Sequence, residues 1–266
     1  ILKIKSMSDF KPADKIQDLQ YFGEYGGVNP SITDSSTYTF LRAGTMEGVF
    51  EGEVEGCYLY SRHWNPSNRY LSMALAEMEG TPSASVTASG MGAITSVILQ
   101  LCSFGDEVVT SRTIYGGTYA FFKNFLPKFN IKANFVDTTK IEEVKAAITP
   151  NTKVIYCETL SNPMLEVSDI RALSELAKEH NCKLIVDNTF TPMIFSPAQL
   201  GADVVVHSMT KFINGMSDCV AGTVCGDEEL INSLYDVNDG AAMLLGPVLD
   251  SFRSASILKN LRTLHI

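Results

Sequence analysis

The sequence has few of the features that mark membrane, secreted and nucleic-acid-binding proteins. No apolar run approaches the roughly 20 residues that span a bilayer. The apolar part of the opening segment, residues 1–6, is too short for a signal peptide. The 21 Lys and Arg residues are outnumbered by 30 Asp and Glu residues, which gives a net charge of −9. This charge argues against nucleic acid or an anionic membrane as a partner.

The sequence also lacks the cysteine and histidine patterns that bind metals. Its six cysteines are scattered without a Cys-x-x-Cys pair, and its four histidines cluster neither with one another nor with the cysteines. We therefore expect no metal site. Cysteines in apolar, strand-like segments behave as small buried hydrophobes, so we expect a cytoplasmic protein in a reducing compartment.

What the sequence does have is the composition of a large folded core. The 266 residues are 45% hydrophobic and 19% charged, enough for one large α/β domain or two smaller ones. Apolar strand-like runs alternate with helical segments, an order typical of a mostly parallel sheet with helices on both faces. We predict a seven-stranded sheet, its last strand antiparallel at an edge, with strands near 83–89, 107–110, 131–137, 153–158, 183–186, 204–206 and 221–225.

The two ends of the chain differ from this alternating body. Residues 1–56 show weak periodicity and several turn signals, which predicts an extended arm with a short helix that lies on another subunit. Residues 57–250 are predicted to form the large domain, in which Ser67 caps a helix that ends at Gly80. Residues 251–266 are expected to begin the connection to a further domain.

A buried-looking strand ends in chemically active side chains between Asp203 and Ile213. The apolar run of residues 204–206 leads directly into Ser208, Thr210 and Lys211. Ligands of parallel α/β sheets gather outside the carboxyl ends of the strands. A lysine there forms a Schiff base with a carbonyl, and the hydroxyls donate hydrogen bonds to an anion. The alternative is an ordinary strand end with an exposed lysine.

A glycine-rich turn follows the first predicted strand. Ser89-Gly90-Met91-Gly92 opens an apolar helix, and the first backbone N–H groups of a helix form an anion site. The turn is not a dinucleotide fingerprint, because Thr95 stands where the third glycine would be, and it is not a Walker loop, because no Gly-Lys-Ser/Thr follows. A phosphate-binding turn and a simple tight turn both remain open.

Two further strand ends carry an aromatic ring and a carboxylate. Tyr115 precedes two glycines where a strand meets a helix, so its ring either faces a planar ligand or packs on its neighbours. Asp187 follows the apolar run of residues 184–186, either as a loop cap or as the partner of a cation.

One ligand matches all four strand ends. Gly90 and Met91 suit a phosphate, and Tyr115 suits a flat ring. Asp187 suits a protonated ring nitrogen, and Lys211 suits an aldehyde. Pyridoxal phosphate carries these four groups, and its protonated ring is an electron sink for a carbanion at a substrate α-carbon. We therefore predict a pyridoxal phosphate site at the carboxyl edge of the sheet.

The same motifs carry a resemblance to a known family. From about Gly23 to the C-terminus, the sequence resembles the Cys/Met-metabolism family of pyridoxal-phosphate enzymes, which have the aspartate-aminotransferase-like fold type I. Gly26-Gly27-Val28-Asn29 and Tyr60-Ser61-Arg62-His63 are most similar to the plant-like branch of its methionine γ-lyases. The family resemblance rests on Tyr60-Ser61-Arg62-x-x-Asn65-Pro66, Ser89-Gly90-Met91, Tyr115-Gly116-Gly117, Asn162-Pro163, Val186-Asp187-Asn188-Thr189 and Ser208-Met209-Thr210-Lys211.

The resemblance implies a role for each residue of these motifs. Lys211 would hold the cofactor's aldehyde and move protons, Asp187 would pair with the pyridinium nitrogen, and Tyr115 would stack on the ring and act as an acid. Tyr60 and Arg62 would reach the phosphate of the neighbouring subunit's cofactor, which implies a homotetramer built from dimers with shared active sites. Asn162 would lie near the cofactor's 3-oxygen. The phosphate would be held by Gly90, Met91, Ser208 and Thr210.

The resemblance also implies a reaction in sulfur amino acid metabolism. We expect a carbon–sulfur lyase that converts L-methionine to methanethiol, 2-oxobutanoate and ammonia by γ-elimination. Bacterial and protozoal methionine γ-lyases carry a cysteine at the position of Gly117, where plant-like members and cystathionine γ-lyases have glycine. Cystathionine γ-lyase and O-acetylhomoserine sulfhydrylase therefore stay as alternatives.

A last expectation concerns the C-terminal end. The family continues beyond the position of Ile266 into a smaller C-terminal domain that holds the arginine for the substrate carboxylate. We expect the chain to lack that domain, so its 266 residues are either an active enzyme or an inactive, truncated cofactor-binding fragment.

Overall fold

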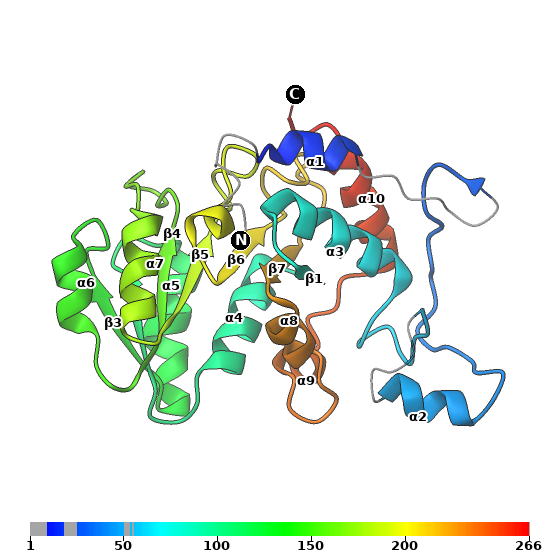
Figure 1. Ribbon diagram of the computed structural model, residues 1–266, viewed down its shortest axis with the longest axis horizontal. Helices are drawn as coiled ribbons and strands as arrows, with labels where there is room; N and C mark the ends of the chain where they lie inside the picture. The colour runs from blue at the N-terminus through cyan, green and yellow to red at the C-terminus, as the bar shows by residue number, and fades with distance from the viewer. Residues whose placement is uncertain (1–9, 19–25, 51–53, 55, 266) are drawn as a thin grey trace, which may run out of the picture.

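The computed structural model describes residues 10–18, 26–50, 54 and 56–265, and its centre is one seven-stranded sheet (Figure 1). The strand order is β1-β7-β6-β5-β4-β2-β3. β7 pairs antiparallel with both of its neighbours, and every other neighbouring pair is parallel. The strands are β1 (Ser83–Thr87), β2 (Glu107–Ser111), β3 (Lys132–Val136), β4 (Thr152–Glu158), β5 (Lys183–Asp187), β6 (Val204–Ser208) and β7 (Gly222–Gly226).

The predicted mostly parallel, seven-stranded α/β fold is confirmed, but the predicted edge position of the last strand is wrong. β7 lies between β1 and β6 and is buried along its whole length. An edge strand leaves one row of backbone groups unpaired, whereas Gly222 to Cys225 pair on both sides. The antiparallel direction of β7 was predicted correctly.

Helices cover both faces of the sheet, because its strands are apolar on both faces. Along β6, Val204 and Val206 pack against the helices of one face, and Val205 packs against those of the other. The first face carries α4 (Gly90–Leu101), α5 (Gly116–Ala120), a π-helix (Phe121–Phe125), a 3₁₀ turn (Leu126–Phe129), α8 (Glu228–Leu234) and α9 (Ala241–Leu245). The second carries α3 (Pro66–Glu79), α6 (Ile141–Ala147), α7 (Ile170–Glu179) and α10 (Ser251–Leu261), with a 3₁₀ turn at Pro197–Leu200.

The start of α3 differs from the prediction. The side chain of Asn65, not that of Ser67, caps the helix by accepting a hydrogen bond from the Ser67 backbone N–H at 2.8 Å. Pro66 takes the first helical position, where its missing N–H costs nothing, so the cap falls one residue before it. The Ser67 hydroxyl instead accepts a hydrogen bond from the Thr33 N–H. Gly80 ends α3, as predicted, and adopts a left-handed conformation.

The helices near the two ends of the chain differ in how they pack on the rest of the fold. α1 (Pro12–Asp18) buries Ile16 in the cluster that α3 and α10 share, whereas α2 (Gly44–Phe50) stands apart from the sheet (Figure 1). α10 lies beside α3 and buries Ile257 and Leu261 in the same cluster. The predicted domain boundaries and the placement of residues 1–56 on another subunit stay predictions. None of the described helices has the length and hydropathy needed to cross a membrane.

Candidate active site

A cavity of about 1220 Å³ opens where β4, β5 and β6 end at their carboxyl edge. Parallel α/β sheets bind ligands at this edge, in the crevice outside the carboxyl ends of the strands. Every predicted site residue lines this cavity except Tyr60 and Arg62: Gly90, Met91, Tyr115, Asn162, Asp187, Ser208, Thr210 and Lys211.

One corner of the cavity is the N-terminus of α4. Ser89 caps the helix, its hydroxyl accepting a hydrogen bond from the Gly92 N–H at 2.9 Å. The N–H groups of Gly90 and Met91 donate to no acceptor within the described residues. Free N–H groups at the start of a twelve-residue helix fit a phosphate.

The end of β6 lies directly beside this corner. A Cβ atom on Gly90 would stand 2.7 Å from the Cβ of Ser208, so only glycine allows the two segments to approach this closely. The Thr210 hydroxyl accepts a hydrogen bond from the Ala221 N–H at 3.0 Å and lies 3.3 Å from the Ala221 carbonyl oxygen. The Thr210 hydroxyl is therefore held at the start of β7. It donates its single proton either to that carbonyl oxygen or to a group in the cavity.

Lys211 follows Thr210 and is exposed. Its backbone N–H donates to the Ser208 carbonyl oxygen in a tight turn, which brings the side chain to the cavity. Within the described residues its ammonium group has no salt bridge. An amine in a cavity with no carboxylate partner is available to a carbonyl ligand.

Asp187 is the buried carboxyl group of the cavity. Its Oδ1 accepts a hydrogen bond from the Thr189 N–H at 2.9 Å, and its Oδ2 accepts one from the Tyr156 hydroxyl at 3.3 Å. Burial raises the pKa of Asp187, and the hydrogen bonds from Thr189 act in the opposite direction. A cation beside the carboxyl group would offset the cost of burial, which fits the protonated nitrogen of a pyridine ring.

A second buried carboxyl group, Glu158, was not singled out from the sequence. It ends β4 beside Asp187, with which it is in register, and is 5% exposed. Burial, and then the neighbouring Asp187, raise the pKa of Glu158 to about 7. The signal was present, because an acidic residue ends an apolar strand here as it does at Asp187. Sequence reasoning also missed other residues of the cavity wall, among them Phe190, Phe212 and Arg253.

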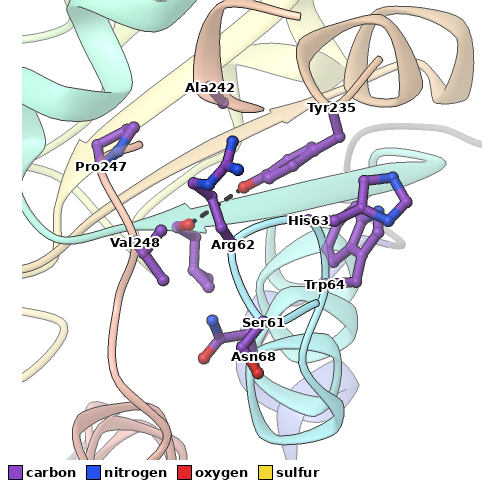
Figure 2. A pocket seen from close by; sticks show the side chains of 10 residues that line it. Ser61, Arg62, His63, Trp64, Asn68, Tyr235, Ala242, Pro247 and Val248 are labelled. Atoms are coloured by element: carbon purple, nitrogen blue, oxygen red, sulfur yellow. Dashed lines mark hydrogen bonds between the residues drawn. The ribbon is translucent and has the colours of Figure 1, made fainter. Parts of the chain in front are cut away.

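Tyr60 and Arg62 lie outside the cavity in this chain. Arg62 lines a separate small pocket, where it lies among Tyr235, Ala242 and Pro247 (Figure 2). Its Nη1 donates a hydrogen bond to the Met243 carbonyl oxygen at 2.7 Å. Eight of the ten predicted site residues therefore line one cavity, whereas Tyr60 and Arg62 do not. That these two reach a neighbouring subunit's cofactor stays a prediction.

The residues of the cavity fit pyridoxal phosphate group by group. A helix N-terminus with free N–H groups faces the same space as a lysine without an acid partner and a buried carboxyl group that needs a cation. These three groups match, in turn, the phosphate, the aldehyde and the ring nitrogen of the cofactor.

Known proteins are similar to this chain in both sequence and fold. A methionine gamma-lyase of Arabidopsis thaliana is 48% identical over 252 residues, which cover 92% of this chain and 57% of that protein. A cystathionine gamma-lyase structure from Lactobacillus plantarum superposes with a TM-score of 0.86 at 29% identity, over 96% of this chain and 64% of that one. A putative O-acetylhomoserine (thiol)-lyase from Campylobacter jejuni, which contains a pyridoxyl-lysine phosphate, gives a TM-score of 0.87 at 27% identity, over 97% and 71% of the two chains.

These relatives are longer than the chain, which spans somewhat more than half of the Arabidopsis protein. The family model described as Cys/Met metabolism PLP-dependent enzyme matches residues 15–266, almost the whole sequence. The chain therefore belongs to the Cys/Met-metabolism family of pyridoxal-phosphate-dependent enzymes.

Proposed function

We propose that the protein is a carbon–sulfur lyase that splits L-methionine by γ-elimination. With one water molecule, methionine yields methanethiol, 2-oxobutanoate and ammonia. The observation that carries the proposal is one cavity in which a lysine without an acid partner, a buried carboxyl group and a free helix N-terminus converge. The 48% identity to a methionine gamma-lyase supports methionine as the substrate.

Each cavity residue is proposed to hold one part of the cofactor. Bound pyridoxal phosphate supplies an electron sink for the negative charge that develops on the substrate. Asp187 holds the ring nitrogen in its protonated form, and Tyr115 covers one ring face. Asn162 contacts the 3-oxygen. The phosphate binds to Gly90, Met91, Ser208 and Thr210.

Two side chains are proposed to move protons. The Nζ of Lys211 would accept the proton from the substrate α-carbon and then help to remove a proton from the β-carbon. The Tyr115 hydroxyl donates the proton that the departing thiolate needs. Both side chains line the cavity and are exposed there, Tyr115 by 47%, which supports these roles.

A partner subunit is proposed to complete the site. Tyr60 and Arg62 lie outside the cavity of their own chain, and the Arg62 guanidinium is placed 5.4 Å from the centre of the Tyr60 ring. We propose that the pair binds the phosphate in a neighbouring subunit, because an arginine fork suits phosphate oxygens. Dimers with shared sites would then pair into a homotetramer. The scattered cysteines support a cytoplasmic location.

The rival substrates are cystathionine and O-acetylhomoserine. Gly117 gives no reason to exclude them. A Cβ atom at this position would stand 2.6 Å from Cε1 of Tyr115 and 3.3 Å from the sulfur of Met91. The position therefore holds no side chain that contacts a methionine substrate. Selectivity for methionine must come from other residues.

Product analysis separates these functions. The protein at its full encoded length is incubated with methionine, with cystathionine, or with O-acetylhomoserine plus sulfide. Methanethiol and 2-oxobutanoate from methionine, at the highest kcat/KM of the three, support the proposal, and faster turnover of another substrate contradicts it. Turnover of methionine by the 266-residue chain alone would rule out the alternative of an inactive cofactor-binding fragment.

A further inference from the structure

Glu158 joins two separate loops of the cavity wall through its two carboxylate oxygens. Oε1 accepts a hydrogen bond from the Tyr115 backbone N–H at 2.8 Å, and Oε2 accepts one from the Asn162 backbone N–H at 2.9 Å. The side chain is 5% exposed, so water does not compete for these bonds. A single carboxylate thus fixes two turns that lie 47 residues apart along the chain.

The turn at Tyr115 lies between the buried residues Ile114 and Thr118 and has no side-chain cap of its own. Tyr115 precedes the five-residue helix α5 without a side-chain cap, and Gly116 follows with no neighbour that would contact a Cβ atom. Glycines leave the backbone many conformations, so local sequence does not determine where the tyrosine ring points. The Tyr115 ring itself is 47% exposed, so its own packing is a weak restraint.

We propose that Glu158 is a positioning residue that sets the distance between Tyr115 and Asn162 across the cofactor cavity. This inference rests on the proposed function, in which Tyr115 covers the ring and Asn162 contacts its 3-oxygen. The rigid end of β4 supplies the anchor, because Glu158 pairs in register with Asp187 of β5. The ring-covering residue, the 3-oxygen contact and the ring-nitrogen partner then share one fixed edge of the sheet.

The test compares Glu158→Gln with a matched substitution. Gln has nearly the volume of Glu but only one acceptor oxygen, so one of the two N–H groups is left facing an NH₂ group. Glu107→Gln is the control, because Glu107 is half-buried and, like Glu158, bridges two segments, here by accepting side-chain hydrogen bonds from Asn134 and Thr149 at the opposite edge of the sheet. Glu158→Asp is a second variant that keeps the charge but shortens the reach.

Two measurements on the full-length protein need no substrate. Hydrogen exchange, at about pH 8 where the wild-type group is ionised, reports the amides of Tyr115 and Asn162 in the cofactor-free protein. Titration with pyridoxal phosphate, followed by the circular dichroism that the bound ring acquires, reports cofactor affinity and ring placement. Because neither uses methionine, a failed lyase assay would refute the proposed function and leave this inference to stand on its own data.

Glu158→Gln should speed exchange of at least one of the two amides by about tenfold, the factor that one lost buried hydrogen bond is worth. The same variant and Glu158→Asp should both weaken the circular dichroism of the bound ring, while Glu107→Gln leaves exchange and dichroism unchanged. Wild-type exchange at both amides in Glu158→Gln would overturn the proposal. Wild-type dichroism in Glu158→Asp would also overturn it. The carboxylate charge would then be enough to place the ring, without a side chain long enough to reach both N–H groups.

Discussion

Gly90 and Ser208 touch so closely that a Cβ atom on residue 90 would stand 2.7 Å from the Ser208 Cβ and 2.9 Å from its Cα. The contact joins the start of α4 to the end of β6, two segments more than 100 residues apart in the sequence. Gly222 of β7 adds to it, because a Cβ atom there would meet the backbone of Ser89 and Gly90. The proposed phosphate site therefore depends on three chain segments packed backbone to backbone.

Gly90→Ala should separate these segments. Overpacking of this kind costs about 1–3 kcal/mol, and we expect both a lower free energy of unfolding and at least a roughly tenfold loss of pyridoxal phosphate affinity. Urea unfolding and cofactor titration measure the two effects. Gly44→Ala is the control, because nothing lies within 4 Å of its Cβ position. Wild-type cofactor affinity in Gly90→Ala would argue against a phosphate at this turn.

Asp187→Asn should remove the charge that keeps the ring nitrogen protonated. We expect kcat to fall by on the order of 100-fold, a loss typical of removing one preorganised charge-stabilising group. Steady-state kinetics with methionine checks this. Asp203→Asn is the matched variant, because Asp203 accepts a backbone hydrogen bond from Leu184 at the opposite end of β5. Equal losses in the two variants would mean that general stability, not the ring nitrogen, explains the effect.

Tyr156→Phe should act through Asp187. Tyr156 is fully buried, edge-on to Phe122, and its hydroxyl bond lowers the pKa of Asp187 against the larger effect of burial. Loss of the hydroxyl should raise that pKa further, so the acid limb of the kcat profile should move to higher pH, with a loss of kcat smaller than in Asp187→Asn.

The control for this shift is another buried tyrosine. Tyr235 donates its hydroxyl hydrogen bond to the Val86 carbonyl oxygen, away from the main cavity (Figure 2). Tyr235→Phe should leave the acid limb where it is in the wild type. An unmoved limb in Tyr156→Phe would show that its hydroxyl does not tune Asp187.

Stability should depend on pH through Glu158. The folded-state pKa of Glu158 is raised to about 7 from the ordinary value of 4.5, by burial first and then by the neighbouring Asp187. A raised carboxyl pKa means that the folded state binds the proton more tightly. Its stabilising contribution is therefore complete below pH 4.5 and is lost as pH rises to about 7, by an amount on the order of 3 kcal/mol.

Urea unfolding of the cofactor-free protein across this pH window checks the sign. The free energy of unfolding of wild type minus that of Glu158→Gln should decrease between pH 4.5 and 7, because Gln does not titrate. A difference that stays constant or increases with pH would contradict the raised pKa.

The parts of the site that the sequence predicted are those that follow a clear apolar run. Lys211 and Asp187 each end a run of buried aliphatic residues, and the position of such a strand end follows from local pattern alone. Glu158 also ends an apolar strand, so its position could have been singled out, but its role depends on the backbone N–H groups of two other loops, which no local pattern reveals.

The two errors in the fold have different causes. The insertion of β7 between β1 and β6 depends on pairing between residues some 140 positions apart. The sequence shows that Gly222 to Gly226 form a strand, but strand order is a non-local property. The Ser67 cap failed for a local reason, since Pro66 already fits the first helical position and leaves the cap to Asn65.

The most direct test of the account is covalent trapping of the cofactor on Lys211. The protein is saturated with pyridoxal phosphate, reduced with borohydride, digested and mapped, alongside Lys211→Ala and a Lys183→Ala control whose lysine pairs with Asp203 at the far edge. We expect a yellow, reducible protein whose label lies on Lys211 in wild type and control, and no label in Lys211→Ala. A reducible chromophore that persists in Lys211→Ala, or a wild-type label on another lysine, would contradict it.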